Sequence, residues 1–222
     1  MRRLFVLVCA LGPLLAQDQQ FVQKLVEELY PKNERLKEIR MGDIVHQLGI
    51  HEGSQVADVG CGGGEFSVIL SHVVGASGKV YCEDIVDSKD WGVRIAKANL
   101  KKQHVKNAVV IRGAPDDPKL SEGSLDAVLI VNAYHEMPKY QAMLGHIKDS
   151  LKPGGHLVIV DNTPLRTGKR PREKQTDNHV LSPGLVAGEL QAAGFRIVDR
   201  DDTFIDNPDS ESAHWMIVVE RP

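Results

Sequence analysis

Hydrophobic and polar positions follow two periods in turn along most of the chain, and this alternation predicts strands and helices. Apolar runs with the character of buried strands occur at 55–60, 79–84, 108–112, 125–132 and 156–161. Helical spacing of apolar residues separates them at 65–74, 91–103 and 139–151. Regular alternation of this kind is typical of α/β proteins, in which helices cover a mainly parallel sheet.

The N-terminal part of the chain has a purely helical pattern. Apolar residues are spaced for helices at 21–29 and 34–48, and Gly49 is placed as the stop of the second helix. The segment 17–50 is therefore expected to be helical and to pack on an α/β domain formed by 51–222.

The C-terminal part changes from alternation to a hairpin. Ser182 followed by Pro183 is a typical helix start, and Gly194 closes the same helix. The strand patterns at 196–205 and 214–220 leave no room for a helix between them. The last two strands should therefore pair antiparallel, which puts one reversed strand in the sheet.

Length and composition fit one soluble α/β domain. The chain has 222 residues, of which 42% are hydrophobic and 26% charged, and its formal net charge is -3. This charge argues against a nucleic-acid partner, because phosphate binders usually carry a dense basic face. One short basic cluster lies in the irregular segment 166–180, which is expected to be a mobile loop with solvated charges. Its members are Arg166, Lys169, Arg170, Arg172 and Lys174.

The first sixteen residues have the layout of a secretory signal peptide. Two arginines follow the initiator Met1, residues 4–16 are almost wholly apolar, and Ala16 precedes a polar run. We therefore expect cleavage after Ala16 and export to the periplasm or the medium. The apolar run is too short for a permanent membrane anchor, so no stable membrane insertion is expected after cleavage. The alternative is a buried N-terminal helix in a cytoplasmic protein.

Cysteine and histidine spacing predicts no metal site. Without the leader two cysteines remain, Cys61 and Cys82, and neither belongs to a Cys/His pattern typical of zinc sites. Both are expected to be small buried residues on or just after neighbouring strands, and a disulfide between them is the less favoured alternative.

A glycine-rich bend after the first predicted strand carries the chemistry. Gly60, Gly62 and Gly64 follow Asp58, and a helix pattern begins directly after them. Glycines at such a bend let backbone N–H groups approach a ligand that a side chain would exclude. Asp84 ends the second strand beside it and can accept both hydroxyls of a ribose.

A nicotinamide or flavin dinucleotide site is the competing interpretation of this bend. The dinucleotide fingerprint needs a third glycine five residues after the first, where the helix packs on the strand. That position holds Glu65, so the fingerprint fails. Asp58 before the first glycine suits a cofactor with a charged amino-acid end and no pyrophosphate.

The bend and four further segments resemble class I S-adenosylmethionine-dependent methyltransferases. Asp58-x-Gly60-x-Gly62-x-Gly64 resembles the family's first motif, and Asp84 its ribose-binding acid. The likeness continues in three segments: Ser124-Leu125-Asp126-Ala127-Val128, Leu151-Lys152-Pro153-Gly154-Gly155-His156-Leu157 and Ala193-Gly194-Phe195. The resemblance implies a Rossmann-like, doubly wound sheet of seven strands in the order 3-2-1-4-5-7-6, with strand seven antiparallel. It also implies S-adenosyl-L-methionine as the cofactor.

Two positions depart from the family or leave a choice open. Members often carry an adenine-binding acid after the glycine that ends strand three, but Gly113 is followed by Ala114 here. Asp116 or Asp117 is then the substitute, and Asp116 is taken as the candidate. Glu83 beside Asp84 leaves a one-residue choice for the ribose acid, and the motif favours Asp84.

The segment after the fourth strand lies where the family places acceptor-side residues. Asn132 is assigned to the cofactor site, and His135 is the candidate general base because its ordinary pKa is near neutral. The alternative for His135 is a packing or capping role. Tyr134 and Glu136 are weaker candidates. His179 lies in the irregular segment ahead of the last predicted helix and is a candidate to reach over the pocket, although a surface role is favoured.

Two functions remain open at this level. The first is an enzyme that methylates an unidentified small molecule, with no assigned oligomeric state. The second is an exported protein that keeps the fold and binds the cofactor without turnover. Export favours this alternative, because the methyl donor is made in the cytoplasm.

Overall fold

The structure, a computed structural model, describes residues 11–163, 170–206 and 213–222. The chain divides into two compact units, one formed by residues 1–46 and the other by residues 47–222. The second unit holds the whole sheet and every residue assigned above to the site.

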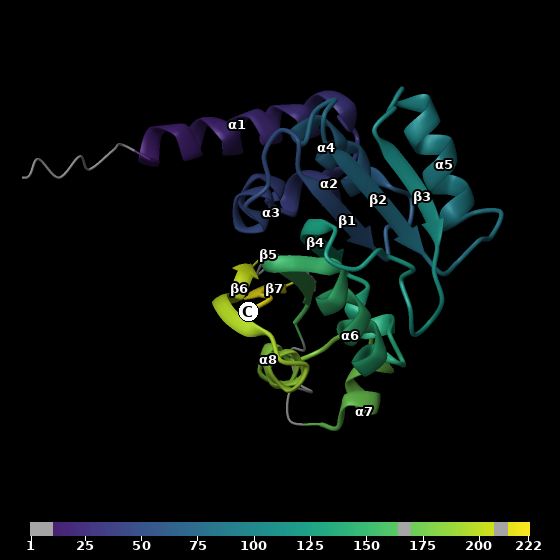
Figure 1. The fold of residues 1–222 in the computed structure, drawn as a ribbon, viewed down its shortest axis with the longest axis vertical. Coiled ribbons are helices and arrows are strands. Elements are labelled where there is room, and N and C mark those ends of the chain that lie inside the picture. Colours follow the sequence, from purple (N-terminus) through teal and green to yellow (C-terminus); the bar gives the residue numbers. More distant parts are fainter. Residues whose placement is uncertain (1–10, 164–169, 207–212) are drawn as a thin grey trace, which may run out of the picture. The chain divides into compact units, whose positions relative to one another are not determined.

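The sheet has seven strands in the order β3-β2-β1-β4-β5-β7-β6, as the resemblance implied (Figure 1). The strands are β1 (Gln55–Val59), β2 (Lys79–Asp84), β3 (Ala108–Arg112), β4 (Leu125–Val131), β5 (Leu151–Asn162), β6 (Arg196–Ile205) and β7 (His214–Glu220). β1 pairs in parallel with β2 and β4, and β7 pairs antiparallel with β5 and β6. The prediction of a Rossmann-like sheet with a reversed strand is confirmed.

Helices cover both faces of the sheet because successive strand residues point to opposite sides. The helices of this unit are α4 (Glu65–Val73), α5 (Val93–Lys102), α6 (Tyr140–Ser150), α7 (Arg172–Thr176) and α8 (Pro183–Ala192). α4 and α5 contact β2 and β3, whereas α8 contacts β6 and β7 (Figure 1). On the α6 and α8 side, one core contains Ala57, Val59, Ile159 and the fully buried Trp215.

The carboxyl ends of the parallel strands meet at one edge of the sheet. β1 leads into the glycine bend, β2 ends at Asp84, and β4 continues into a short 3₁₀ turn, η1 (Tyr134–Glu136). Ligands of such sheets bind beyond these ends, near the point where the strand order reverses. Here that point lies between β1 and β4, so the fold places the site there.

Two predicted elements are wrong in detail. The helix expected at 34–48 is two helices, α2 (Glu34–Glu38) and α3 (Met41–Leu48), because Arg40 adopts a left-handed φ of 52°. The irregular segment expected at 166–180 contains α7 in its described part, and residues 164–169 lie outside the described residues.

The N-terminal unit begins with α1 (Leu11–Leu29), followed by α2 and most of α3. The side-chain amide of Gln19 donates a hydrogen bond of 2.9 Å to Asp43, which ties α1 to α3. Residues 1–10 of the expected signal peptide lie outside the described residues, so the leader stays a prediction. Among the helices that are described, none combines the length and apolar character needed to cross a membrane.

Candidate functional site

The glycine bend has the geometry that only glycine adopts easily. Gly60, Gly62 and Gly64 have φ values of 74°, 52° and 78°. A Cβ atom on Gly60 would lie 2.5 Å from Cβ of Ala133, and one on Gly64 would lie 3.2 Å from Cβ of Ala96. Both the backbone conformation and the space therefore require glycine, as the sequence predicted for this bend.

Asp84 is tied to the bend through its carboxylate. Oδ2 accepts a hydrogen bond of 2.8 Å from the N–H of Gly62, and Oδ1 accepts one of 2.7 Å from the N–H of Val86. The side chain is almost fully buried at the carboxyl end of β2. The carboxylate thus lies beside the glycines, where the ribose acid was predicted.

Glu83 is the other acid in this position, and it is also buried. Its Oε1 atom has no hydrogen-bond partner among the described residues. Burial, together with the nearby charge of Asp84, raises the pKa of Glu83 to about 8. The backbone carbonyl of Glu83 accepts hydrogen bonds from Gly60 and Cys61, which holds the bend against β2.

Asp58 sits under the bend, between β1 and α4. Its Oδ2 atom accepts a hydrogen bond of 2.6 Å from the hydroxyl of Ser67 in α4. Burial raises the pKa of Asp58 to about 7, although the hydrogen bond from Ser67 acts in the opposite direction. Near neutral pH the carboxyl of Asp58, directly beneath the glycines, can therefore be either protonated or ionised.

Sequence reasoning missed Trp91, which lies over the bend. A Cβ atom on Gly62 would meet Cζ2 of this indole at 2.5 Å, and the tryptophan is 53% exposed. The residue lies in the turn between β2 and α5, where N–H of Val93 donates to the carbonyl of Val86. The signal available in the sequence was an aromatic residue in the turn that follows Asp84, the candidate ribose acid.

The end of β4 lies on the other side of the bend. Ala133 occupies the space that a side chain on Gly60 would need, and Asn132 has a left-handed φ of 50°. The N–H of Asn132 donates to the carbonyl of Val160, whereas its buried Oδ1 has no partner among the described residues. A strained residue with an unpaired polar atom is typical of ligand sites. The assignment of Asn132 to the cofactor site stays a prediction.

His135 and Asp161 form a buried pair on this side. Nδ1 of His135 lies 2.6 Å from Oδ1 of Asp161, and Oδ2 accepts a hydrogen bond of 3.0 Å from the N–H of His135. Burial alone would lower the pKa of His135, but the hydrogen bond and charge of Asp161, with the charge of Glu136, outweigh it and raise the pKa. Asp161 was expected only as the end of a strand. β5 pairs with β4, and this pairing brings Asp161 to His135, which follows the end of β4.

Glu136 and His179 lie at the outer side of His135. Oε1 of Glu136 is 3.3 Å from Nε2 of His135 and 2.7 Å from Nδ1 of His179. The two imidazole rings meet edge to face with their centroids 5.6 Å apart. His179 is 70% exposed at its side chain, as a surface role requires, yet the structure also brings it to His135.

Tyr134 points away from these residues into the core. Its hydroxyl donates a hydrogen bond of 2.8 Å to Glu189, and Nε of Arg172 lies 3.1 Å from the same carboxylate. Burial, followed by the charge of Glu189, raises the pKa of Tyr134. The guanidinium of Arg172 also lies over the ring of Tyr140, with 4.2 Å to its centroid. The expectation of a solvated charge is therefore wrong for Arg172, and Tyr134 has a structural role.

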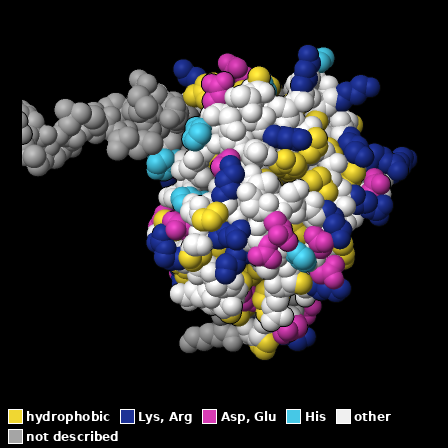
Figure 2. Space-filling model, viewed as in Figure 1, with side chains coloured by type: hydrophobic (Ala, Val, Ile, Leu, Met, Phe, Trp, Pro, Cys, Tyr) yellow, Lys and Arg dark blue, Asp and Glu magenta, His cyan; other side chains and the backbone are white. Residues whose placement is uncertain are grey.

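Asp116 is not brought to the buried carboxylates. It lies on the surface, where it accepts a hydrogen bond of 2.8 Å from Lys139. That contact, followed by the charge of Lys139, lowers the pKa of Asp116. On the face of the molecule shown in Figure 2, Lys and Arg side chains occur in several separate places, with Asp and Glu among them.

Cys61 and Cys82 are both buried and both free, as the favoured prediction had it. A side-chain hydrogen bond with Cys82, followed by burial, raises the pKa of the Cys61 thiol. The Cys61 thiol is therefore not poised to react, because the reactive form is the thiolate.

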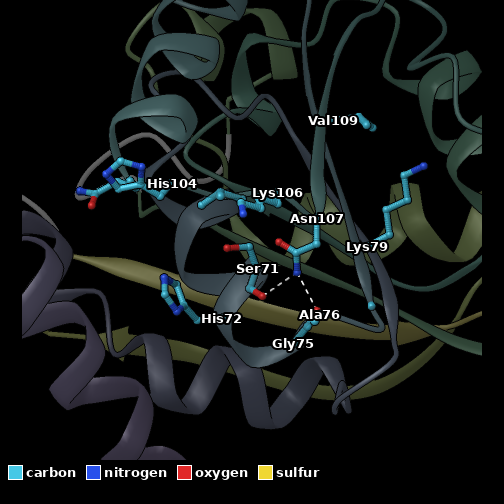
Figure 3. A pocket seen from close by; sticks show the side chains of 12 residues that line it. Ser71, His72, Gly75, Ala76, Lys79, His104, Lys106, Asn107 and Val109 are labelled. Carbon is cyan, nitrogen blue, oxygen red and sulfur yellow. Dashed lines mark hydrogen bonds between the residues drawn. The ribbon is translucent and has the colours of Figure 1, made fainter.

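A hollow of about 580 Å³ opens at the opposite edge of the sheet (Figure 3). It lies beside Lys79, the first residue of β2, and Asn107, which precedes β3. The amide of Asn107 donates to the carbonyls of Ser71 and Gly75, so it closes the end of α4 (Figure 3). This hollow is separate from the glycine bend, which lies at the carboxyl ends of the strands.

Comparison with known proteins agrees with the fold and the motifs. A family model described as a methyltransferase domain matches residues 50–207. A demethylmenaquinone methyltransferase of Lactococcus lactis is 34% identical over 124 residues, which are 56% of this chain and 45% of the relative. The enzyme of the same name from Oceanobacillus iheyensis is 26% identical over 164 residues, 70% of this chain and 68% of the relative. The chain spans about half the length of several of the relatives that it matches.

Solved structures share the fold. A methyltransferase of Aquifex aeolicus that depends on S-adenosylmethionine superposes with a TM-score of 0.70 at 24% identity, over 92% of this chain and 99% of the other. A geranyl diphosphate C-methyltransferase of Streptomyces coelicolor, solved with Mg²⁺, geranyl diphosphate and S-adenosyl-L-homocysteine, gives 0.68 at 14% identity, over 88% and 83%. Because the family model spans most of the sheet domain and the strand order agrees with it, this chain belongs to the class I family of S-adenosylmethionine-dependent methyltransferases.

Proposed function

We propose that this chain transfers the methyl group of S-adenosylmethionine to a small molecule that carries an ionisable hydroxyl, such as a phenol or hydroquinone. The observation that carries the proposal is the buried pair of His135 and Asp161, next to the bend that suits the donor. Two of the relatives reported above are named for a quinone substrate, which makes hydroquinones the first class to test.

The residues of the bend fit the donor. Glycine at 60 and 62 lets Ala133 and the exposed Trp91 lie directly against the bend, where a larger residue would collide with them. In this proposal Asp84, which is tied to the bend, accepts the ribose hydroxyls, and Asp58 supports the amino-acid end from beneath the glycines. The unpaired Oδ1 of Asn132 is a further candidate acceptor. Asp116 lies on the surface in an ion pair with Lys139, so its assignment to the adenine stays a prediction.

S-adenosylmethionine supplies a methyl group that is already activated on a sulfonium. The protein must then mainly align the acceptor, which contributes several kcal/mol and about 7–11 kcal/mol in the best model reactions. His135 is placed to promote loss of the acceptor's proton, and Asp161 fixes its ring by holding Nδ1. Burial of His135, which is 7% exposed, keeps competing water away from the ring.

The test is release of S-adenosylhomocysteine from S-adenosylmethionine with a panel of phenols, hydroquinones, thiols and amines. We expect turnover with a hydroxyl-bearing ring, loss of donor binding in Asp58→Ala, and a fall in turnover with unchanged donor affinity in His135→Ala. His146→Ala, an exposed position in α6, is the matched control and should behave like the wild type. Donor binding without turnover on any acceptor would instead support a binding protein.

We propose in addition that residues 1–16 direct export, as their cationic and apolar layout predicts. Expression of the full-length chain in a Gram-negative host should give a periplasmic protein whose N-terminal residue is Gln17. An intact Met1 on cytoplasmic protein would contradict export and would remove the question of how the methyl donor reaches the enzyme.

A further inference from the structure

Three side chains with metal-binding atoms converge where β4 and β5 end. They are His135 and Glu136 of η1 and His179 of the segment between α7 and α8. One ligand atom from each lies within 4.8 Å of the other two. Sequence spacing could not show this group, because His179 lies 43 positions after Glu136.

The separations are close to those that a tetrahedral ion needs. Zinc binds imidazole nitrogen and carboxylate oxygen at about 2.0–2.2 Å, which places neighbouring tetrahedral ligand atoms about 3.4 Å apart. Nε2 of His135 lies 3.3 Å from Oε1 of Glu136, and Nδ1 of His179 lies 2.7 Å from the same oxygen. Glu136 and His179 are exposed side chains, so small rotations suffice to open the shorter distance.

A second layer of contacts fixes the two histidines. Asp161 holds Nδ1 of His135, which leaves Nε2 directed at Glu136. The next residue, Asn162, donates a hydrogen bond of 3.0 Å to the backbone carbonyl of His179, which has a left-handed φ of 56°. Adjacent residues at the end of β5 thus hold both histidines. A carboxylate on the far nitrogen of a metal-binding histidine is the usual supporting contact of such sites.

We propose that His135, Glu136 and His179 bind a divalent transition-metal ion, with zinc as the first choice. Two imidazole nitrogens and one carboxylate oxygen are a donor set of catalytic zinc sites, in which a fourth position stays open for water or substrate. The group borders solvent on the side of Glu136 and His179, which are exposed, so an acceptor could reach it from there, whereas His135 is buried.

The role of the ion rests on the proposed function. A hydroxyl of the acceptor in the open position would have its pKa lowered by the ion, and its proton would leave to solvent water. With the ion bound, the ion would promote proton loss in place of His135, because a nitrogen lone pair that binds a metal cannot accept a proton. The role of His135 as a base, and its test in Asp161→Asn, therefore belong to the metal-free protein. His135 in the loaded protein is a ligand.

The test measures metal binding alone. The full-length chain, without a histidine tag, is stripped with EDTA, dialysed and titrated with zinc chloride by calorimetry, and with cobalt(II) by visible absorption. We expect one ion per chain, and at least tenfold weaker binding in both His179→Ala and Glu136→Gln. Asp161→Asn should weaken binding about 10–100-fold, which is typical for loss of a supporting carboxylate.

His146→Ala is the control, because it removes an exposed histidine of α6 that is not a member of this group. Zinc binding that is equally strong in wild type and His179→Ala would overturn the site, and so would an equal loss in His146→Ala. His179 is exposed, so its replacement leaves the core intact and a folding defect cannot explain a loss of binding. The metal titrations contain neither the methyl donor nor a methyl acceptor. A chain that binds zinc but never releases S-adenosylhomocysteine therefore contradicts the proposed function alone.

Discussion

Asp161 holds His135 twice, once at the ring and once at the backbone. Oδ1 of Asp161 lies 2.6 Å from Nδ1 of His135, and Oδ2 accepts the N–H of the same residue at 3.0 Å. The Asp161 side chain is fully buried. One carboxylate at the end of β5 therefore sets both the position and the tautomer of the histidine that follows β4.

Asp161→Asn should lower turnover strongly while leaving donor affinity within about twofold of the wild type. The amide keeps the shape of the side chain but offers an N–H toward Nδ1, which favours the wrong tautomer of His135. General acid–base contributions of this kind are worth about 10²–10⁴ in rate. The measurement is kcat and KM from S-adenosylhomocysteine release, with donor affinity from calorimetry. Unchanged kcat would show that the pair only supports the fold.

Gly60→Ala should lose most of the donor affinity and reduce stability. The new Cβ would lie 2.5 Å from Cβ of Ala133, and the φ of 74° costs about 1 kcal/mol or more for alanine. Gly188→Ala is the matched control: it lies in α8 with no atom near its added Cβ, and it should stabilise the chain by about 1 kcal/mol. Urea unfolding and donor titration of both variants separate the two effects. Wild-type donor affinity in Gly60→Ala would mean that the donor binds elsewhere.

The glycine bend and the bounds of individual strands were predictable because they depend on local pattern, whereas the strand order was implied by the resemblance to the methyltransferase family. β2 and β3 begin and end at the predicted residues, since their apolar runs are bounded by polar turns. The break at Arg40 was not predictable, because the helical spacing continues through it.

Long-range partners account for most of what the sequence did not show in the site. Asp161 meets His135 because β4 and β5 pair in register. His179 meets Glu136 from the segment between α7 and α8, whose backbone accepts a hydrogen bond from Asn162 at the end of β5. Arg172 is largely withdrawn from solvent through its ion pair with Glu189, which lies in another helix. The sequence around a charged residue in such a cluster does not show that it has a distant partner of opposite charge.

Trp91 should report donor binding by fluorescence. The chain has two tryptophans, and the other, Trp215, is fully buried in the core, so a change in emission on titration would come from the exposed Trp91 against Gly62. Entry of a ligand at the bend must displace or cover that indole. We expect a saturable change in emission with S-adenosylmethionine, absent in Trp91→Phe. A signal that persists in Trp91→Phe would place the donor near the core instead of the bend.

The unliganded chain should lose stability as pH rises through neutrality. Asp58 and Glu83 have pKa values raised by burial to about 7 and about 8, above their ordinary values of 3.8 and 4.5. The folded state therefore holds protons that the unfolded state has released. The stabilising contribution is complete below about pH 4 and declines until both groups ionise near pH 8. Glu83→Gln imitates the neutral form, so its free energy of unfolding should fall less between pH 5.5 and 8.5 than that of the wild type. Urea titrations without donor at several pH values measure this difference, and parallel curves for the two proteins would show that Glu83 is already ionised in the folded chain.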